Sequence, residues 1–259
     1  MSLVAKGEPV HLYDILPAPG ICPYAQRAWI ALEELGVPYQ TTLIDAANKA
    51  EDFKALYASI VQNTDDPAKV PTIIDGDAKL TESLVVVEYL DAKYGGEKGL
   101  LPKDPLQNAQ VKLFVELFTN KFSSFIYKLL SAKTEEEVTA LATALENNLE
   151  VLDKYIRASG GSDGAGYFLG DRYSYAETIT TPFLRRALLV LKAHRGFDIL
   201  GLAHSNSLDR LLQWIQASLD RASNKSTGPS DEQIIQSATR WLGAPLPNYQ
   251  YKSAKVAQA

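Results

Sequence analysis

The chain has 259 residues, enough for two domains of ordinary size with a sizeable buried core. Its 26 basic and 31 acidic residues give a net charge of −5, so no global charge attracts nucleic acid or an anionic membrane, and we expect neither partner. A single cysteine and three histidines without ligand spacing exclude a disulfide framework and a zinc site, and we expect no metal; the lack of a long uncharged apolar segment predicts a soluble, cytoplasmic protein.

The chain opens with a strand, a helix and a second strand. Residues 10–15 alternate apolar and polar side chains, as a short strand does, and lead into a Pro-Ala-Pro-Gly turn at 17–20. A helix follows over residues 24–35, and residues 39–44 form the second expected strand. This order favours a parallel pair of strands joined by the helix.

The rest of the first hundred residues completes a small α/β domain. A helix is expected around residues 52–57, and residues 70–74 and 79–81 resemble a hairpin. A further helix runs over residues 83–94. We therefore predict a first domain over residues 1–96.

A stretch rich in glycine and proline at residues 97–104 marks the linker, and beyond it the strand signals fade. Residues 105–259 are expected to form an all-helical domain, because apolar side chains recur there at helical spacing. The expected helices cover residues 106–130, 138–152, 175–194, 208–219 and 231–242. Residues 160–166 are expected to be a flexible connection and residues 245–259 a weakly ordered tail.

The single cysteine, Cys22, stands between the first strand and the first helix. A thiol at a helix N-terminus faces unpaired backbone N–H groups and the positive end of the helix dipole, which favour the nucleophilic thiolate. The alternative is a buried cysteine that acts as a small hydrophobic side chain. Ala25 occupies the place of a second, resolving cysteine. Any redox chemistry would therefore pass through a mixed disulfide with an outside thiol.

Several motifs occur in an order that resembles the cytosolic glutathione transferases. They are Cys-Pro-Tyr-Ala at 22–25, Lys-Val-Pro at 69–71 before a strand, Thr-Glu-Ser at 81–83 opening a helix, and the segments 27–39 and 88–91. The cysteine makes the chain similar to the omega class and its relatives, the lambda transferases and dehydroascorbate reductases. The resemblance implies an N-terminal thioredoxin-like domain in the order βαβ-α-ββα, followed by an all-helical C-terminal domain.

The resemblance also implies a binding site for glutathione as co-substrate, with Cys22 as the catalytic nucleophile. Val70 would pair its backbone N–H and C=O with the cysteinyl backbone of glutathione, as neighbouring strands pair. Pro71 matches the cis-proline of the family. The loop over residues 61–69 is longer than the family pattern before the Val-Pro pair.

Other residues would hold the two ends of glutathione. Glu82 and Ser83 match the family pair that binds the γ-glutamyl ammonium and carboxylate. Lys49 matches the lysine that pairs with the glycyl carboxylate, and Tyr24 is a candidate wall for the glutathione sulfur. Taken alone, Ser83 is an ordinary helix cap, Lys49 a solvated lysine and Tyr24 a packing residue.

The second domain supplies the candidates for the acceptor site. Four phenylalanines at helical spacing in the first long helix are more typical of a core or dimer surface, with one or two facing the cleft. They are Phe114, Phe118, Phe122 and Phe125. We name Phe122, Tyr127 and Trp241 as candidate walls of the acceptor site. The Ser-Tyr-Ala-Glu sequence at 174–177 is a capping box that we interpret as structural.

The main functional hypothesis is a glutathione-dependent thiol transferase or reductase that uses Cys22. A second hypothesis is conjugation of glutathione to electrophiles, for which Tyr13 is the alternative hydroxyl donor. A third is a non-catalytic ligand carrier on the same fold. The joint presence of Cys22, Pro71, Glu82 and Ser83 argues against the carrier.

The partners implied by the resemblance are glutathione, a small electrophilic or disulfide acceptor, and a second copy of the chain. Candidate acceptors are glutathionylated proteins, small mixed disulfides, dehydroascorbate, and glutathionyl ketones or quinols. The homodimer contact is expected at the helix that begins at Leu106 and at the end of the first domain.

Overall fold

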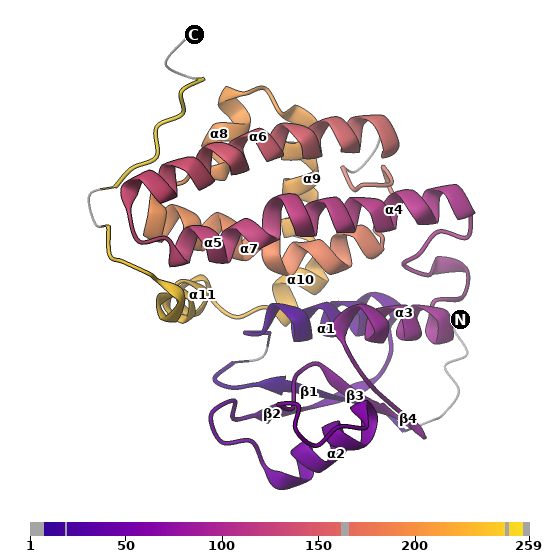
Figure 1. Cartoon of the computed structure of the whole chain (residues 1–259). Helices are drawn as coiled ribbons and strands as arrows, with labels where there is room; N and C mark the ends of the chain where they lie inside the picture. The colour runs from indigo at the N-terminus through magenta and orange to yellow at the C-terminus, as the bar shows by residue number, and fades with distance from the viewer. Residues whose placement is uncertain (1–7, 19, 162–165, 247–248, 256–259) are drawn as a thin grey trace. The chain divides into compact units, whose positions relative to one another are not determined.

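The computed structural model describes residues 8–18, 20–161, 166–246 and 249–255 (Figure 1). The chain divides into two compact units. The first unit comprises Met1–Leu101 and Ala222–Pro229, and the second comprises Pro102–Arg221 and Ser230–Ala259. The sequence places everything after residue 105 in the helical domain, whereas in the structure residues 222–229 pack with the first unit.

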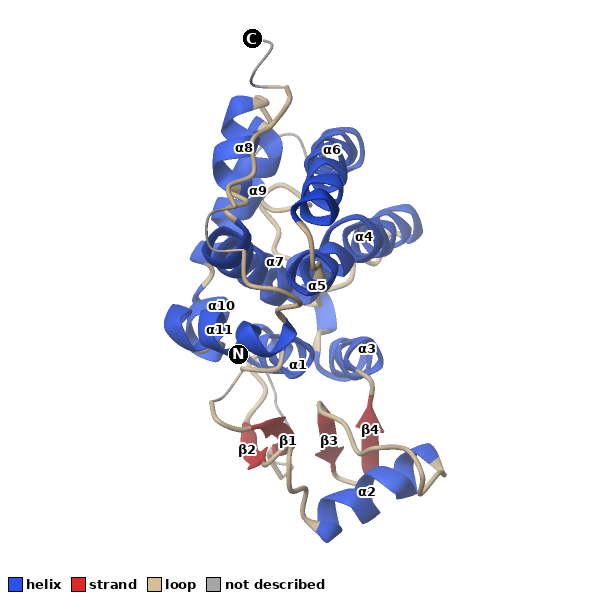
Figure 2. Ribbon diagram, turned by 60° about the vertical axis from the view of Figure 1, so that its left-hand side comes forward, coloured by secondary structure: helices blue, strands red, loops and turns tan. Residues whose placement is uncertain are grey.

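The first unit is built on a four-stranded sheet in the order β2-β1-β3-β4. The strands are β1 (Val10–Ile15), β2 (Tyr39–Ile44), β3 (Thr72–Asp75) and β4 (Ala78–Thr81). β1 runs parallel to β2 and antiparallel to β3, and β3 and β4 form a hairpin. The thioredoxin-like order that the sequence predicts is confirmed, and the four strands stand side by side in Figure 2.

Three helices cover this sheet. α1 (Pro23–Leu35) and α3 (Ser83–Tyr94) lie together over one face, and α2 (Glu51–Val61) lies on the other side (Figures 1 and 2). The alternation of β1 explains these two layers, because successive strand residues point to opposite faces. Leu12 is buried on one face, while the Tyr13 ring lies on the other, 5.2 Å from the ring of Phe53 in α2.

Asp75, the last residue of β3, holds α3 against the sheet. Its carboxylate accepts hydrogen bonds from the Tyr89 hydroxyl at 2.9 Å, Lys93 Nζ at 2.7 Å and the Tyr94 hydroxyl at 2.9 Å. Burial alone would raise the pKa of Asp75, but these hydrogen bonds outweigh burial and keep that pKa below its usual value. The network fixes α3, whose first residue is Ser83.

The first part of the predicted linker at residues 97–104 belongs to the first unit. A short 3₁₀ turn, Gly96–Lys98, follows α3. The carboxylate of Asp91 then accepts hydrogen bonds from the backbone N–H groups of Leu100 and Leu101. These bonds tie the chain to α3, and the first unit accordingly extends to Leu101.

The second unit is helical in the part that the structure describes. Its α-helices are α4 (Pro105–Phe118), α5 (Ser124–Ser131), α6 (Glu135–Ser159), α7 (Tyr175–Arg195), α8 (Ile199–Ser205), α9 (Asp209–Asp220) and α11 (Asp231–Ala238). Phe114 and Phe118 of α4 pack around Trp214 of α9, with ring centroids 5.2 and 5.9 Å away. This aromatic cluster forms the core of the unit, as the sequence pattern indicates.

The helix expected over residues 106–130 is interrupted. A π-helical turn, Thr119–Ser123, separates α4 from α5. The hydroxyls of Thr119 and Ser124 donate to the carbonyls of Val115 and Asn120, at 2.8 and 2.9 Å. Hydroxyls that donate to the carbonyls of the preceding turn compete with the regular backbone hydrogen bonds of the helix. The spacing of apolar residues does not reveal this competition, so the sequence predicts one unbroken helix.

The tail expected to be weakly ordered is packed against α6 over residues 249–255. Glu146 of α6 has 1 % of its surface exposed, and it accepts hydrogen bonds from Tyr251 at 2.8 Å and Ser253 at 2.7 Å. Asn206 donates to it as well, at 2.9 Å. Burial alone would raise the pKa of Glu146, but these donors together keep it below its usual value. Most of the connection expected at 160–166 lies outside the described residues.

Candidate functional site

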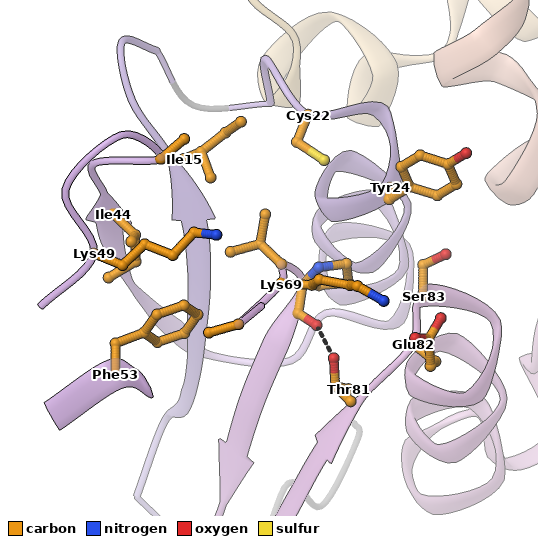
Figure 3. A pocket seen from close by; sticks show the side chains of 14 residues that line it. Ile15, Cys22, Tyr24, Ile44, Lys49, Phe53, Lys69, Thr81, Glu82 and Ser83 are labelled. Atoms are coloured by element: carbon orange, nitrogen blue, oxygen red, sulfur yellow. Dashed lines mark hydrogen bonds between the residues drawn. The ribbon is translucent and has the colours of Figure 1, made fainter. Parts of the chain in front are cut away.

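A pocket of about 480 Å³ opens in the first unit, where α1, the ends of β1 and β2, the segment before β3 and the start of α3 meet (Figure 3). It is lined by Ile15, Cys22, Tyr24, Ile44, Ala46, Lys49, Phe53, Ala68, Lys69, Val70, Pro71, Thr81, Glu82 and Ser83. Every residue that the sequence analysis assigns to the catalytic thiol and to glutathione is in this lining. Residues that are up to 68 positions apart in sequence, from Ile15 to Ser83, therefore share one cavity.

Cys22 occupies the N-cap of α1. Its backbone is extended, with φ −81° and ψ 116°, and its carbonyl accepts the first helical hydrogen bond from Gln26 N at 3.0 Å. Pro23 follows at the first helical position, where its missing N–H costs nothing. The half-buried side chain directs its sulfur into the pocket (Figure 3). This placement sets the thiol at the positive end of the helix.

Val70 and Pro71 form the edge of the pocket before β3, and the peptide bond between them is cis. The Thr81 hydroxyl donates to the carbonyl of Pro71 at 2.9 Å, and the Thr72 hydroxyl donates to the carbonyl of Lys69 at 2.8 Å. These two bonds hold the backbone on either side of Val70. A ligand with an extended backbone can lie along such a fixed edge as an added strand does.

Glu82 and Ser83 begin α3 on the opposite side of the pocket from Lys49 (Figure 3). Glu82 is the N-cap and has φ +67°, a conformation that non-glycine residues rarely adopt and that costs about 1–3 kcal/mol. Ser83 has 6 % of its surface exposed, and its Oγ accepts a hydrogen bond from Arg27 Nη1 at 3.1 Å. Because arginine can only donate, the hydroxyl hydrogen of Ser83 remains for another acceptor.

Arg27 is a functional candidate that the sequence reasoning missed. It is buried on α1, and its guanidinium lies 5.3 Å from the ring centre of Tyr24 as well as bonding Ser83. One side chain thus orients two residues of the pocket lining. The sequence offers two signals: Arg27 opens the matching segment 27–39, and its three-residue spacing from Tyr24 places both on one face of α1.

Lys69 is a second cation in the lining that the sequence analysis used only as part of a motif. Figure 3 shows the amine of Lys69 on the side of Glu82 and Ser83, and the amine of Lys49 on the side of Ile44. The pocket therefore offers two cations at separate places and one carboxylate. This arrangement complements a ligand with two carboxylates and one ammonium group.

A second cavity of about 390 Å³ adjoins the pocket and shares Ala46, Lys49 and Ala68 with it. Residues 64–68 line its outer side. They belong to the segment 61–69 that the sequence analysis found to be long. This loop consequently borders the binding pocket next to Lys49.

Residues 21–93 match the family model described as glutathione S-transferase, N-terminal domain. This match assigns the first domain of the chain to the glutathione S-transferase family. Glutathione S-transferase omega-1 of Mus musculus is 32% identical to it over 167 residues, which cover 64% of this chain and 63% of the relative. Glutathione S-transferase U9 of Arabidopsis thaliana is 23% identical over 216 residues, covering 83% and 85%.

Solved structures resemble the chain over nearly its whole length. Glutathione transferase Omega 2C from Trametes versicolor is 27% identical with a TM-score of 0.70, covering 90% of this chain and 99% of the other. The dehydroascorbate reductase of Chlamydomonas reinhardtii has a TM-score of 0.69 at 23% identity, covering 92% and 100%. The likeness to the omega transferase supports the family, and the likeness to the dehydroascorbate reductase shows the shared fold.

The three acceptor-site candidates lie in the second unit. Phe122 has 2 % of its surface exposed and packs 4.6 Å from the ring of Phe118, so the core leaves almost none of it for a ligand. Tyr127 and Trp241 lie together, with ring centres 5.3 Å apart, and Trp241 is 47 % exposed. The structure brings two of the three candidates together and places the third in the aromatic core.

The described residues were found to hold neither a cluster of metal ligands nor a membrane-spanning helix. Within the described ranges, no group of three histidine, cysteine, aspartate or glutamate side chains is placed to hold a metal ion. No helix among the described residues is long and apolar enough to span a membrane.

Proposed function

We propose that this protein is a glutathione-dependent thiol transferase of the omega type, with Cys22 as its nucleophile. The Cys22 thiolate attacks the glutathionyl sulfur of a mixed disulfide, and the acceptor leaves as a thiol after taking up a proton. A second glutathione thiolate then attacks the glutathionyl sulfur on Cys22. Glutathione disulfide leaves and the Cys22 thiolate is restored, so the cycle needs no other oxidant or reductant.

The observation that carries this proposal is the position of Cys22 at the N-cap of α1, inside the pocket that also contains the proposed glutathione ligands. The helix N-terminus favours the thiolate over the thiol. Since the chain has one cysteine, the second sulfur of each exchange comes from glutathione. The cycle is therefore monothiol.

Glutathione fits the pocket in one orientation under this proposal. Its cysteinyl backbone pairs with Val70, which brings its sulfur toward Cys22. Its γ-glutamyl ammonium lies against Glu82 and its γ-glutamyl carboxylate accepts from the Ser83 hydroxyl. Its glycyl carboxylate pairs with Lys49. The charge pattern of the lining and the zwitterionic charge of glutathione support this orientation.

The acceptor is proposed by class. Glutathionylated proteins, small mixed disulfides and glutathionyl ketones or quinols each present a glutathionyl sulfur to the Cys22 thiolate, and the remaining fragment leaves with a proton. Dehydroascorbate is attacked at a carbonyl carbon instead; one glutathione then attacks the Cys22 sulfur and releases ascorbate, and a second glutathione reduces the resulting mixed disulfide. Omega-class transferases and a dehydroascorbate reductase among the similar proteins support this range. The half-buried Tyr127 and the exposed Trp241, whose rings meet edge to face, support an apolar acceptor wall in the second unit.

Conjugation through Tyr13 is not favoured by the geometry. The Tyr13 ring packs on Phe53 and His11 and is absent from the described pocket lining. Burial raises the pKa of Tyr13, with a further contribution from the charge of Asp52. A phenol that activates a bound thiol would instead need an accessible hydroxyl at the sulfur.

We also propose a homodimer. Leu84 and Val85 of α3 are 41 % and 54 % exposed, and Leu106 and Leu113 of α4 are 66 % and 50 % exposed. Large apolar side chains with this exposure on neighbouring helical turns are typical of surfaces that another protein covers. Light scattering after size exclusion tests this, and a monomer at micromolar concentration contradicts it.

The experiment that tests the thiol transferase is a substrate panel on the wild type and Cys22→Ser. Disulfide reduction, dehydroascorbate reduction and aryl-halide conjugation are measured side by side. We expect Cys22→Ser to lose the first two activities while calorimetry still detects glutathione binding. Full disulfide reduction by Cys22→Ser refutes the mechanism, and a failure of glutathione disulfide to glutathionylate the wild type, seen by mass spectrometry, favours a carrier.

A further inference from the structure

The short helix α10 (Ala222–Thr227) belongs to the first unit, although about 190 residues separate it from α1. It packs along α1 through two hydrogen bonds. Near the end of α1, Ser223 Oγ bonds Glu34 Oε1, and near its start Gln26 Nε2 donates to Thr227 Oγ1 at 3.4 Å. Thr227 has 1 % of its surface exposed. The segment 222–229 is therefore packed into the first unit.

The same segment contacts the turn that precedes the catalytic thiol. Gly20 has φ +69°, and a β-carbon placed on it would lie 1.9 Å from the carbonyl oxygen of Thr227 and 3.3 Å from the α-carbon of Gly228. Such distances leave no room for any side chain. The backbone of residues 227–228 therefore closes directly on Gly20.

The other side of Gly20 is held by β1. The backbone N–H of Gly20 donates to Asp14 Oδ2 at 2.7 Å, and the side chain of Asp14 is fully buried. Asp14 Oδ1 also accepts from the N–H of Ile15 at 2.7 Å. Gly20 is thus held between a carboxylate of the sheet and a carbonyl of the segment 222–229, two residues before Cys22.

We infer that the segment 222–229 positions the Cys22 thiol, with Thr227 and Gly20 as the positioning residues. Neither residue touches glutathione in the orientation proposed above. Both act through the turn that sets where the chain enters α1, and hence where the sulfur stands in the pocket. The consequence for turnover rests on the proposed function, whereas the consequence for the reactivity of Cys22 does not.

Positioning of the thiol should affect kcat and leave KM for glutathione unchanged. Glutathione is held by Val70, Glu82 and Ser83, which are carried by other elements than the turn. A displaced turn should therefore leave KM for glutathione nearly unchanged. Misplacing a reacting atom by about 1 Å can lower a rate about 100-fold. The loss should appear in kcat and in the alkylation of the thiol.

The first test is Gly20→Ala, compared with Gly76→Ala. Gly76 lies in the β3–β4 turn with φ +60°, and a β-carbon on it meets nothing within 4 Å. The two variants share the backbone strain, but only Gly20→Ala forces the turn off Thr227. We expect kcat and the iodoacetamide alkylation rate of Cys22 to fall about 10- to 100-fold in Gly20→Ala and less than about twofold in Gly76→Ala.

A second pair of variants guards against poor folding of Gly20→Ala. Thr227→Val is nearly isosteric and removes the hydroxyl that accepts from Gln26, while Thr227→Ser keeps it. Ser223→Ala removes the bond to Glu34 at the far end of α1. We expect Thr227→Val to slow alkylation about two- to fivefold, and Thr227→Ser and Ser223→Ala to leave it unchanged.

The outcomes are distinct. Slower alkylation in Gly20→Ala and Thr227→Val, with KM for glutathione unchanged, supports the positioning role. Wild-type alkylation rates in both variants overturn it, and so does an equal effect of Ser223→Ala, because the segment would then act only through stability. If Cys22→Ser keeps its disulfide reductase activity, the proposed function fails, but the alkylation rates still test the positioning of the thiol.

Discussion

Replacing Glu177 of α7 should strongly destabilise the helical unit. Glu177 is fully buried and accepts four hydrogen bonds. Its Oε1 accepts from Phe168 N at 2.7 Å and Trp214 Nε1 at 3.0 Å. Its Oε2 accepts from Ser174 N at 3.0 Å and Ser174 Oγ at 2.8 Å. The capping box that the sequence predicts thus also anchors the aromatic core.

The magnitude follows from the donors left behind. Glu177→Ala leaves the N–H groups of Phe168, Ser174 and Trp214 buried without this acceptor, and each unsatisfied group costs about 1–3 kcal/mol. We expect a loss of at least about 4 kcal/mol in the free energy of unfolding, a large part of the 5–15 kcal/mol typical of a domain. Glu177→Gln keeps one oxygen acceptor, and we expect about 1–3 kcal/mol.

The assay is urea unfolding followed by circular dichroism and by tryptophan fluorescence, to which Trp214 contributes together with Trp29 and Trp241. The matched control is the capping box of α11, where Gln233 accepts from Ser230 N at 3.0 Å at the exposed surface. Gln233→Ala should cost less than about 1 kcal/mol. Equal losses for Glu177→Ala and Gln233→Ala would refute the reasoning, because burial would then make no difference to the two caps.

Three further predictions concern binding and the tail. Lys49→Met should raise KM for glutathione about 5- to 20-fold by removing its charge-assisted contact with the glycyl carboxylate, with kcat unchanged, while Lys54→Met, in an exposed ion pair with Glu51, changes neither; equal effects contradict it. Arg27→Met should weaken glutathione binding non-additively with Ser83→Ala, so additivity in a double-mutant cycle argues against their coupling. Because the folded pKa of Glu146 lies below its unfolded value of about 4.3, its stabilisation is present above that value and is lost as pH falls through the folded pKa. Limited proteolysis should then release residues 249–255 in acid, and tail cleavage in Glu146→Gln should vary less with pH.

The resemblance to a known family assigned the residues of the pocket, and local patterns in the sequence predicted the elements that carry them. Cys22, Val70 and Ser83 each stand where a turn passes into a helix or strand, and such transitions carry strong signals from proline, capping residues and apolar periodicity. The strand order then brings these transitions to one edge of the sheet. The first domain could therefore be predicted with nearly correct boundaries for its strands and helices.

Contacts across long sequence separations could not be predicted in this way. Arg27 and Ser83 are 56 residues apart, and Gln26 and Thr227 are 201 residues apart. α10 has six residues, Ala-Ser-Asn-Lys-Ser-Thr, without an apolar stripe, so no periodicity marks it as a helix that packs. The tail contains polar side chains that become ordered by donating to the buried Glu146.

The sequence by itself determined that a thiol would stand at the start of the first helix, because a single Cys-Pro step after a strand fixes that position locally. Tertiary structure alone decided what holds the thiol there. Gly20 lies between Asp14 and the backbone of Thr227. Only glycine fits there, because the backbone of Thr227 leaves no space for a β-carbon. Space between distant segments is a property of packing, which no local pattern of residues encodes.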